Sequence, residues 1–177
     1  MQAVNRGKLA VLSMLLLAVA LAAFALWWNV TGGKRTLAFW GREGGKRIIA
    51  EKATVELLRL AANDADGSSE RLTIGGKSYV VVARADITGA RGLIHARHSL
   101  LEDASFDWEA TVPAGDYTLA ARFRDAHGAT TVAFDFEREH LAYVESGQER
   151  KAAAKIVAGW QTFARRHLPA GTKNPAE

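Results

Sequence analysis

The chain contains no cysteine among its 177 residues. This absence excludes disulfide bonds, the lipid-modified cysteine of bacterial lipoproteins, and CxxC metal or redox motifs. The sequence also lacks a P-loop, a dinucleotide-binding glycine fingerprint and the GxSxG elbow of serine hydrolases. We therefore expect a protein that is not an enzyme and that holds no cofactor.

Charge is also missing from one long stretch near the N-terminus. Residues 9–28 read LAVLSMLLLAVALAAFALWW and include no Asp, Glu, Lys or Arg. A helix of about 20 such residues can cross the apolar part of a bilayer. Two basic residues precede the run, and Trp27 and Trp28 close it where an interfacial aromatic belt would lie. Residues 1–28 are therefore predicted to be a short tail followed by a transmembrane signal anchor.

A cleaved export signal is the alternative for this segment. Ala23 and Ala25 are separated by one residue, which is the small-x-small spacing of a cleavage site. However, the apolar run is longer than the roughly 7 to 15 residues of a usual signal core, and cleavage there would leave tryptophans at the new N-terminus. These two points favour a retained, single-pass anchor.

Basic residues cluster after the apolar run, and they bear on the orientation of the chain. The basic cluster comprises Lys34, Arg35, Arg42, Lys46 and Arg47. By the positive-inside rule it would place the following domain in the cytoplasm. A short N-terminal tail with one or two basic residues is instead typical of signal anchors, which export the domain that follows. The alanine- and arginine-rich composition indicates a bacterium, and we favour a cytoplasmic (inner) membrane protein whose C-terminal domain is periplasmic or extracellular.

The same cluster accounts for the net charge of +4. Between Lys34 and Leu60 there are seven basic and three acidic residues, whereas from residue 61 onward there are fourteen basic and sixteen acidic ones. Basic side chains close to a membrane are attracted to anionic lipid headgroups by about 1 kcal/mol each. Nucleic-acid binding would need a basic stripe with aromatic residues on the folded domain, which is missing. Membrane lipid is therefore the expected partner of the cluster, and nucleic acid is not.

Two pairs of glycines divide the segment that follows the apolar run. Because paired glycines interrupt long helices, residues 29–52 are predicted to be a basic juxtamembrane tether with one short strand, from Thr36 to Trp40. Residues 53–168 carry the patterns of a folded domain. The polar end of the chain, residues 169–177, is predicted to be a disordered tail.

Alternating apolar and polar residues dominate the predicted domain. This pattern indicates half-buried β-strands, and Gly75-Gly76 supplies the positive φ angles of a tight hairpin turn. Strands are expected at residues 53–60, 71–74, 77–87, 106–112, 117–124, 130–137 and 140–144. Because short turns join consecutive strands, neighbouring strands should be antiparallel.

The C-terminal part of the domain has helical periodicity instead. From Gly147 to His167, apolar residues recur every three or four positions and form one stripe. The predicted fold class is thus α+β: an N-terminal transmembrane helix, then a two-layer domain in which an antiparallel meander sheet is packed by a C-terminal amphipathic helix. Four aromatic residues are expected in its core: Trp108, Phe123, Phe134 and Trp160.

Residues 92–108, GLIHARHSLLEDASFDW, bring several titratable side chains close together in the sequence. On a helix of about three turns, His95, His98 and Glu102 would lie on one side, and Asp107 could join them from the next strand. Two imidazoles and a carboxylate could bind a metal ion or assist hydrolysis. The simpler interpretation is a solvated helix face, because HxxH alone is a weak motif and the zincin glutamate is missing.

The function that best fits these features is a membrane-anchored extracytoplasmic binding or assembly module without catalytic activity. Such a module would be an accessory subunit of a membrane or envelope complex, with a protein partner there. The alternative is a metal-binding or hydrolytic domain that uses the helix face of His95, His98 and Glu102. A third hypothesis, a structural spacer, predicts no concave surface.

Overall fold

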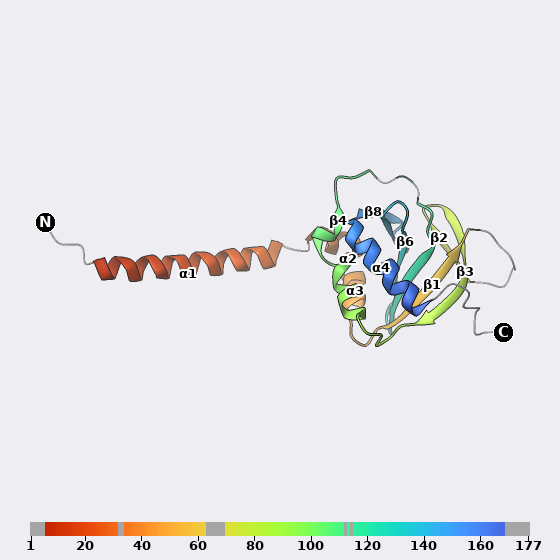
Figure 1. The fold of residues 1–177 in the computed structure, drawn as a ribbon, viewed down its shortest axis with the longest axis horizontal. Helices are drawn as coiled ribbons and strands as arrows, with labels where there is room; N and C mark the ends of the chain where they lie inside the picture. The colour runs from red at the N-terminus through yellow and green to blue at the C-terminus, as the bar shows by residue number, and fades with distance from the viewer. Residues whose placement is uncertain (1–5, 32–33, 63–69, 112, 114, 169–177) are drawn as a thin grey trace. The chain divides into compact units, whose positions relative to one another are not determined.

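The computed structural model describes residues 6–31, 34–62, 70–111, 113 and 115–168 (Figure 1). The chain divides into two compact units, Met1–Lys34 and Arg35–Glu177. The described residues include four α-helices and one eight-stranded antiparallel sheet, which confirms the predicted α+β class. The tail predicted at residues 169–177 lies outside the described residues.

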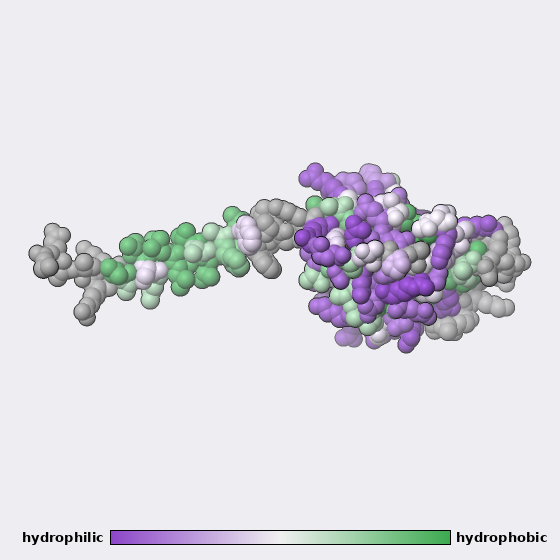
Figure 2. Space-filling view, turned by 90° about the horizontal axis from the view of Figure 1, so that it is seen from above, coloured by the Kyte–Doolittle hydropathy of each residue, from purple (hydrophilic) through white to green (hydrophobic). Residues whose placement is uncertain are grey.

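The described part of the first unit contains helix α1 (Arg6–Thr31). Its stretch from Leu9 to Trp27 has a mean hydropathy of 2.8 and is 0% buried. At about 1.5 Å per residue, such a stretch extends for roughly 28 Å, close to the apolar thickness of a bilayer. Apolar residues lie on every side of α1, and Figure 2 shows them along the helix. The helix is thus long and apolar enough to span a membrane, as a cleaved export signal would also be.

The second unit is built around the eight-stranded sheet. The strands are β1 (Thr54–Ala61), β2 (Arg71–Ile74), β3 (Lys77–Asp86), β4 (Phe106–Asp107), β5 (Leu119–Asp125), β6 (Gly128–Asp135), β7 (His140–Tyr143) and β8 (Gln148–Ala152). Their order across the sheet is β2-β3-β1-β5-β6-β7-β8-β4. From β5 to β8, each strand pairs with the next one along the chain, so this part of the sheet is an antiparallel meander.

The hairpin between β2 and β3 turns where the sequence predicts. Gly75 and Gly76 have φ angles of 56° and 78°, in the left-handed region that glycine adopts without a steric penalty. The resulting register places Leu72 opposite Tyr79, and both side chains are buried. The prediction for this hairpin is confirmed.

Two sequence predictions about the sheet are wrong. The strand expected at residues 106–112 is limited to Phe106–Asp107, which pairs with β8. The helix expected from Gly147 begins only at Ala154, where α4 (Ala154–His167) starts, because the intervening residues form β8. Four of the five residues of β8 are polar or charged, so the strand has no apolar alternation from which it could be predicted.

Helix α2 (Lys34–Ile49) lies where the sequence predicted a tether, and the strand predicted at Thr36–Trp40 is wrong. Trp40 and Ile48 are fully buried, so this segment contributes to the core of the second unit. Each large apolar side chain that is fully buried contributes about 1.5 to 3 kcal/mol to the stability of the fold. Much of the predicted tether is therefore part of the folded domain.

Glycines explain why α2 was difficult to predict. The helix is kinked at Gly41, where φ is 66°. A Cβ atom at Gly44 would lie 3.1 Å from the hydroxyl oxygen of Tyr143 on β7. Paired glycines predict a break in a helix, but here a glycine allows the helix to approach the sheet closely.

Hydrophobic clusters lie on both faces of the sheet. Adjacent residues of β5 belong to different clusters, Ala121 to the larger and Ala120 to the smaller, because side chains alternate between the faces of a strand. Helices α2, α3 (Leu93–Ser99) and α4 all contribute to the larger cluster. The four aromatic residues predicted in the core divide as follows: Phe123, Phe134 and Trp160 are buried, and Trp108 is partly buried.

Candidate functional site

The stretch at residues 92–108 forms a shorter helix than the sequence predicts. Helix α3 ends at Ser99, and a 3-10 turn follows at Asp103–Ser105. His95 and His98 are both exposed on α3, but they line different hollows. His95 lies in the groove between α3 and α4, whereas His98 lines a pocket between α3 and the end of α2.

The two predicted carboxylates do not complete a site with these histidines. Glu102 lies beyond the end of α3, and Asp107 lies in β4; both side chains are exposed. Among the described residues, no three His, Cys, Asp or Glu side chains are grouped so that they could hold a metal ion. The structure therefore does not bring the four predicted side chains together.

The same stretch instead fixes the N-terminal half of α2. The Asp103 carboxylate accepts hydrogen bonds from the backbone N–H and the hydroxyl group of Thr36, both at 2.9 Å. An acceptor at this point satisfies a donor that the first turn of a helix leaves free. The Trp40 indole Nε1 donates to the carbonyl oxygen of Leu100 at 2.6 Å. These contacts join α2 to residues 60 or 67 positions later in the chain.

Arg97, also on α3, fixes the opposite end of α2. Its side chain is buried, with 6% of the residue exposed. Nη1 donates to the carbonyl oxygen of Ala50 at 2.7 Å, and Nη2 donates to that of Ala53 at 3.2 Å. The guanidinium carbon lies 5.7 Å from the centre of the Phe123 ring, within the range of a cation–π interaction. Arg97 thus links α3 to the segment that joins α2 and β1.

The charge of Arg97 is not balanced by a carboxylate. Within the described part of the chain it forms no ion pair, and its buried Nε atom has no hydrogen-bond partner. Burial lowers the pKa of the guanidinium group, yet arginine remains protonated in proteins. The carbonyl groups of Ala50 and Ala53 offer partial charges only. A buried positive charge therefore remains without an anionic partner.

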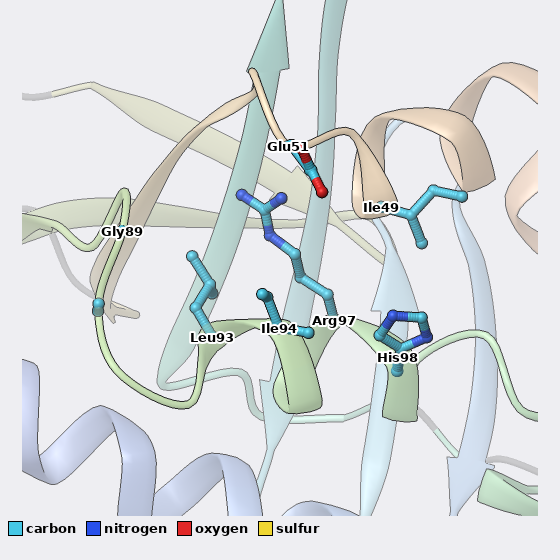
Figure 3. A pocket seen from close by; sticks show the side chains of 8 residues that line it. Ile49, Glu51, Gly89, Leu93, Ile94, Arg97 and His98 are labelled. Atoms are coloured by element: carbon cyan, nitrogen blue, oxygen red, sulfur yellow. The ribbon is translucent and has the colours of Figure 1, made fainter.

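This arginine lines a pocket of about 330 Å³ (Figure 3). The pocket is lined by Ile49, Glu51, Gly89, Ala90, Leu93, Ile94, Arg97 and His98. In Figure 3 the Arg97 side chain extends from α3 toward the segment after α2 that carries Glu51. Two isoleucines on its rim are well exposed, Ile49 by 46% and Ile94 by 64%. A buried cation thus lies beside an open apolar hollow.

The groups that line the pocket are suited to recognition. Its titratable side chains are Glu51, Arg97 and His98, and the first and last of these are exposed at the rim. Among the described residues that line it, none has a hydroxyl or thiol side chain, so these residues offer no such nucleophile. A guanidinium group with apolar walls can bind an anion that carries an apolar group.

Arg97 is the residue that the sequence analysis missed. Leu93, Arg97 and Leu100 follow one another at intervals of four and three residues, which is the spacing of a buried helix stripe. A charged residue within an otherwise apolar stripe is the signal that could have indicated it. The histidines at neighbouring positions, His95 and His98, lie on the exposed side of the same helix.

Two other polar residues, His140 and Asp135, are buried in the sheet. His140 lies in β7, where a strand was expected at residues 140–144, and it is 4% exposed; burial lowers its pKa. Asp135, the last residue of β6, is 1% exposed. Its carboxylate accepts hydrogen bonds from the backbone N–H groups of Asp116, Glu137 and Arg138. Asp135 therefore stabilises the turn between β6 and β7.

The basic cluster predicted to face lipid is distributed over α2. Arg42 and Lys46 are exposed, and Lys46 pairs with Glu43 at 2.9 Å. The side chain of Arg47 is only 14% exposed and pairs with Asp125 at 3.3 Å. Arg35 is exposed and lies 3.5 Å from Glu109, whereas the side chain of Lys34 lies outside the described part. Four described members thus differ in their availability to a membrane surface.

Comparisons with known proteins do not assign the chain to a family. No protein-family model, no curated protein and no solved structure matches it. A functional proposal for this chain therefore depends on its own residues: an apolar N-terminal helix, a domain joined to it by two glycines, and a pocket that contains an unbalanced buried arginine.

Proposed function

We propose that the protein is a single-pass, membrane-anchored binding module, and that the α2–α3 pocket is its ligand site. The module has no catalytic role and serves as an accessory subunit of a membrane or envelope complex. Helix α1 is the anchor, in the cytoplasmic membrane, and the second unit is extracytoplasmic. The observation that carries the proposal is the pocket, because a structural spacer would need neither an open apolar hollow nor an unbalanced charge within it.

The composition of the pocket supports binding to a ligand or a partner protein. Exposed apolar residues around a concave surface are typical of interaction sites. Ile49 and Ile94 provide such a rim, while the buried Arg97 supplies a polar group that can fix the orientation of a ligand. These features are those of a recognition site on a folded domain.

The sequence around α2 supports attachment to a membrane. Only Gly32 and Gly33 separate α1 from α2. The exposed side chains of Arg42 and Lys46 on α2 would lie within reach of anionic headgroups if α1 crosses the bilayer, and each would contribute on the order of 1 kcal/mol. Arg47 contributes less to lipid binding in this proposal, because its side chain is paired with Asp125 inside the domain.

The anchor and its orientation can be tested by labelling a single cysteine. The chain has no cysteine, so Ala126→Cys in the exposed β5–β6 turn creates a unique thiol. We expect the protein to resist extraction from membranes by alkaline carbonate and to react with a membrane-impermeant maleimide in intact cells. Soluble protein that lacks α1 would contradict the anchor, and labelling only after cell lysis would contradict the orientation.

The binding role can be tested by photocrosslinking in native membranes. A benzophenone amino acid at Ile94, on the pocket rim, is compared with the same group at Val82, which is 40% exposed outside the pocket. We expect an adduct from position 94 that disappears when Ala90→Trp fills the pocket. Equal adducts from both positions, or an adduct that survives Ala90→Trp, would contradict the proposed role of the pocket.

A further inference from the structure

We propose that the α2–α3 pocket binds a carboxylate carried on a short apolar group, with Arg97 as its counter-charge. This inference rests on the proposed function of the pocket as a ligand site and adds the chemical class of the ligand. It depends on three observations: the unbalanced charge of Arg97, the apolar rim, and the single carboxylate at the entrance.

The charge of Arg97 indicates an anion. A buried ion without an opposite charge beside it is costly, and proteins commonly balance such an ion with a counter-charge. The carbonyl oxygens of Ala50 and Ala53 hold Nη1 and Nη2, so the guanidinium plane is fixed before a ligand arrives. A guanidinium group has five N–H donors, so Nη1 and Nη2 each keep a second hydrogen that the bonds to Ala50 and Ala53 do not use. Because Arg97 lines the pocket, these hydrogens are the donors that we assign to a carboxylate.

The walls of the pocket indicate an apolar group next to the anion. Ile49, Leu93 and Ile94 line the pocket, and the two isoleucines are largely exposed to water. A short hydrocarbon chain would cover part of this surface, at about 25 cal/mol per Å² of apolar area removed from water. The volume of about 330 Å³ is at the lower end of the range for small-molecule sites.

Glu51, the one negative side chain among the described lining residues, favours a monoanion as the ligand. Glu51 lies on the rim and would repel a phosphate dianion more strongly than a carboxylate. A cationic ligand would in turn be repelled by Arg97, and a metal ion would find only Glu51 and His98 as ligands among the lining residues. The ligand class that remains is a carboxylate next to an apolar group. Two sources have this chemistry: a free short-chain acid, and the C-terminus of a polypeptide that ends in an apolar residue.

The direct test is a titration of the full chain in lipid nanodiscs, observed through labelled isoleucine methyl groups. Hexanoate is compared with hexanamide, which has the same chain without the charge. We expect hexanoate to shift the methyl signals of Ile49 and Ile94 but not that of Ile74, which is buried in the smaller cluster. A hydrogen bond to a charged group increases the binding affinity about tenfold or more. Hexanamide, which has no charge, should therefore bind at least tenfold more weakly than hexanoate.

Three substitutions sharpen this test. Arg97→Met should abolish the preference for hexanoate over hexanamide, and the Ile74 signal reports whether that variant is folded. Glu51→Gln should tighten hexanoate binding severalfold, because it removes a like charge from the entrance. Ile94→Asp, at a position that is 64% exposed, should abolish binding, whereas Val82→Asp serves as its matched control and should leave binding unchanged.

Two peptides distinguish the sources of the carboxylate. A five-residue peptide that ends in leucine is compared with its C-terminal amide under the same conditions. Binding of the free peptide but not the amide supports a polypeptide terminus as the ligand, and binding of hexanoate alone supports a free acid. If neither carboxylate binds at millimolar concentration, or if hexanamide binds equally well, the inference is wrong. A pocket-dependent crosslink from position 94 would then still support the proposed function.

Discussion

The regions around Arg122 and Arg97 bury an arginine in two different ways. Arg122, on β5, is 5% exposed, and its Nη2 atom lies 2.6 Å from the Glu70 carboxylate. That carboxylate also pairs with Arg84 at 3.0 Å. Arg97 is 6% exposed and contacts carbonyl groups instead. Burial of a charge is thus not what distinguishes the pocket; the absence of a compensating anion is.

The largest expected loss of stability is at Arg122, the buried arginine that has a carboxylate partner. Glu70→Gln leaves the buried Arg122 without its anion, so we expect a loss of about 3 kcal/mol in the free energy of unfolding, the lower end for a broken buried pair because Glu70 is partly exposed. Urea unfolding of the detergent-solubilised chain, followed by tryptophan fluorescence, measures it. Glu51→Gln at the pocket is the matched control and should change stability by less than about 0.5 kcal/mol. Equal losses in the two variants would contradict the comparison.

A smaller loss is expected when the uncompensated arginine is removed. Arg97→Met breaks two charged hydrogen bonds, to Ala50 and Ala53, but it also removes a buried charge that has no anion. These effects oppose each other, so we expect a net loss of about 2 kcal/mol. Hexanoate should raise the melting temperature of the parent chain but not of this variant. A loss larger than that of Glu70→Gln would show that Arg97 is mainly structural.

The two regions should also respond differently to acid. The hydrogen bond from Arg122, followed by the nearby charges of Arg122 and Arg84, holds the pKa of Glu70 below its usual value of 4.5. A carboxyl group whose folded pKa is lowered contributes stability above its unfolded pKa and loses it as pH falls through the folded pKa. Unfolding between pH 6 and 3 should therefore show an acid-sensitive component near and below pH 4.5 that Glu70→Gln lacks. Arg97→Met should retain that component.

The smallest effect is expected at the exposed histidines of α3. His95 and His98 lie on the same helix as Arg97, but both are exposed. Alanine at both positions should change the free energy of unfolding by no more than about 0.5 kcal/mol. Elemental analysis of untagged protein, followed by zinc titration of the parent and the double variant, provides the second measurement. Stoichiometric zinc that depends on the two histidines would restore the metal-binding hypothesis.

Local patterns in the sequence predicted most strands of the sheet. Alternation of apolar and polar residues depends on neighbours two positions apart, and the Gly75-Gly76 turn depends on two adjacent residues. Strand β8 was missed because its sequence, QERKA, has no alternation of this kind and its pairing with β7 carries the information instead. The predictable part of the fold is thus the part encoded at short range.

The pocket depends on contacts at long range, which explains why the sequence did not reveal it. Arg97 donates to a carbonyl group 47 positions earlier, and the opposite wall of the pocket comes from the end of a helix predicted to be a tether. His98 was singled out and does line the pocket, but its chemical type suggested a metal ligand. The spacing of Leu93, Arg97 and Leu100 was the readable signal for a buried arginine.

The hydrogen bonds that hold α2 and the segment after it against the rest of the domain have a mechanical consequence. Any tension that enters the second unit along the chain from its N-terminal side reaches α2 first. Within α2, Thr36 donates a hydrogen bond to the Asp103 carboxylate and Trp40 donates one to the carbonyl oxygen of Leu100. Directly after α2, the carbonyl oxygen of Ala50 accepts a hydrogen bond from Arg97. The next element, β1, is hydrogen-bonded on both sides, to β3 and to β5. To pull β1 out of the sheet, its hydrogen bonds to β3 and to β5 would have to break together. The contacts of α2, in contrast, could break one at a time. A domain pulled from this end should therefore yield in two stages, with release of the helix at low force and rupture of the sheet at high force.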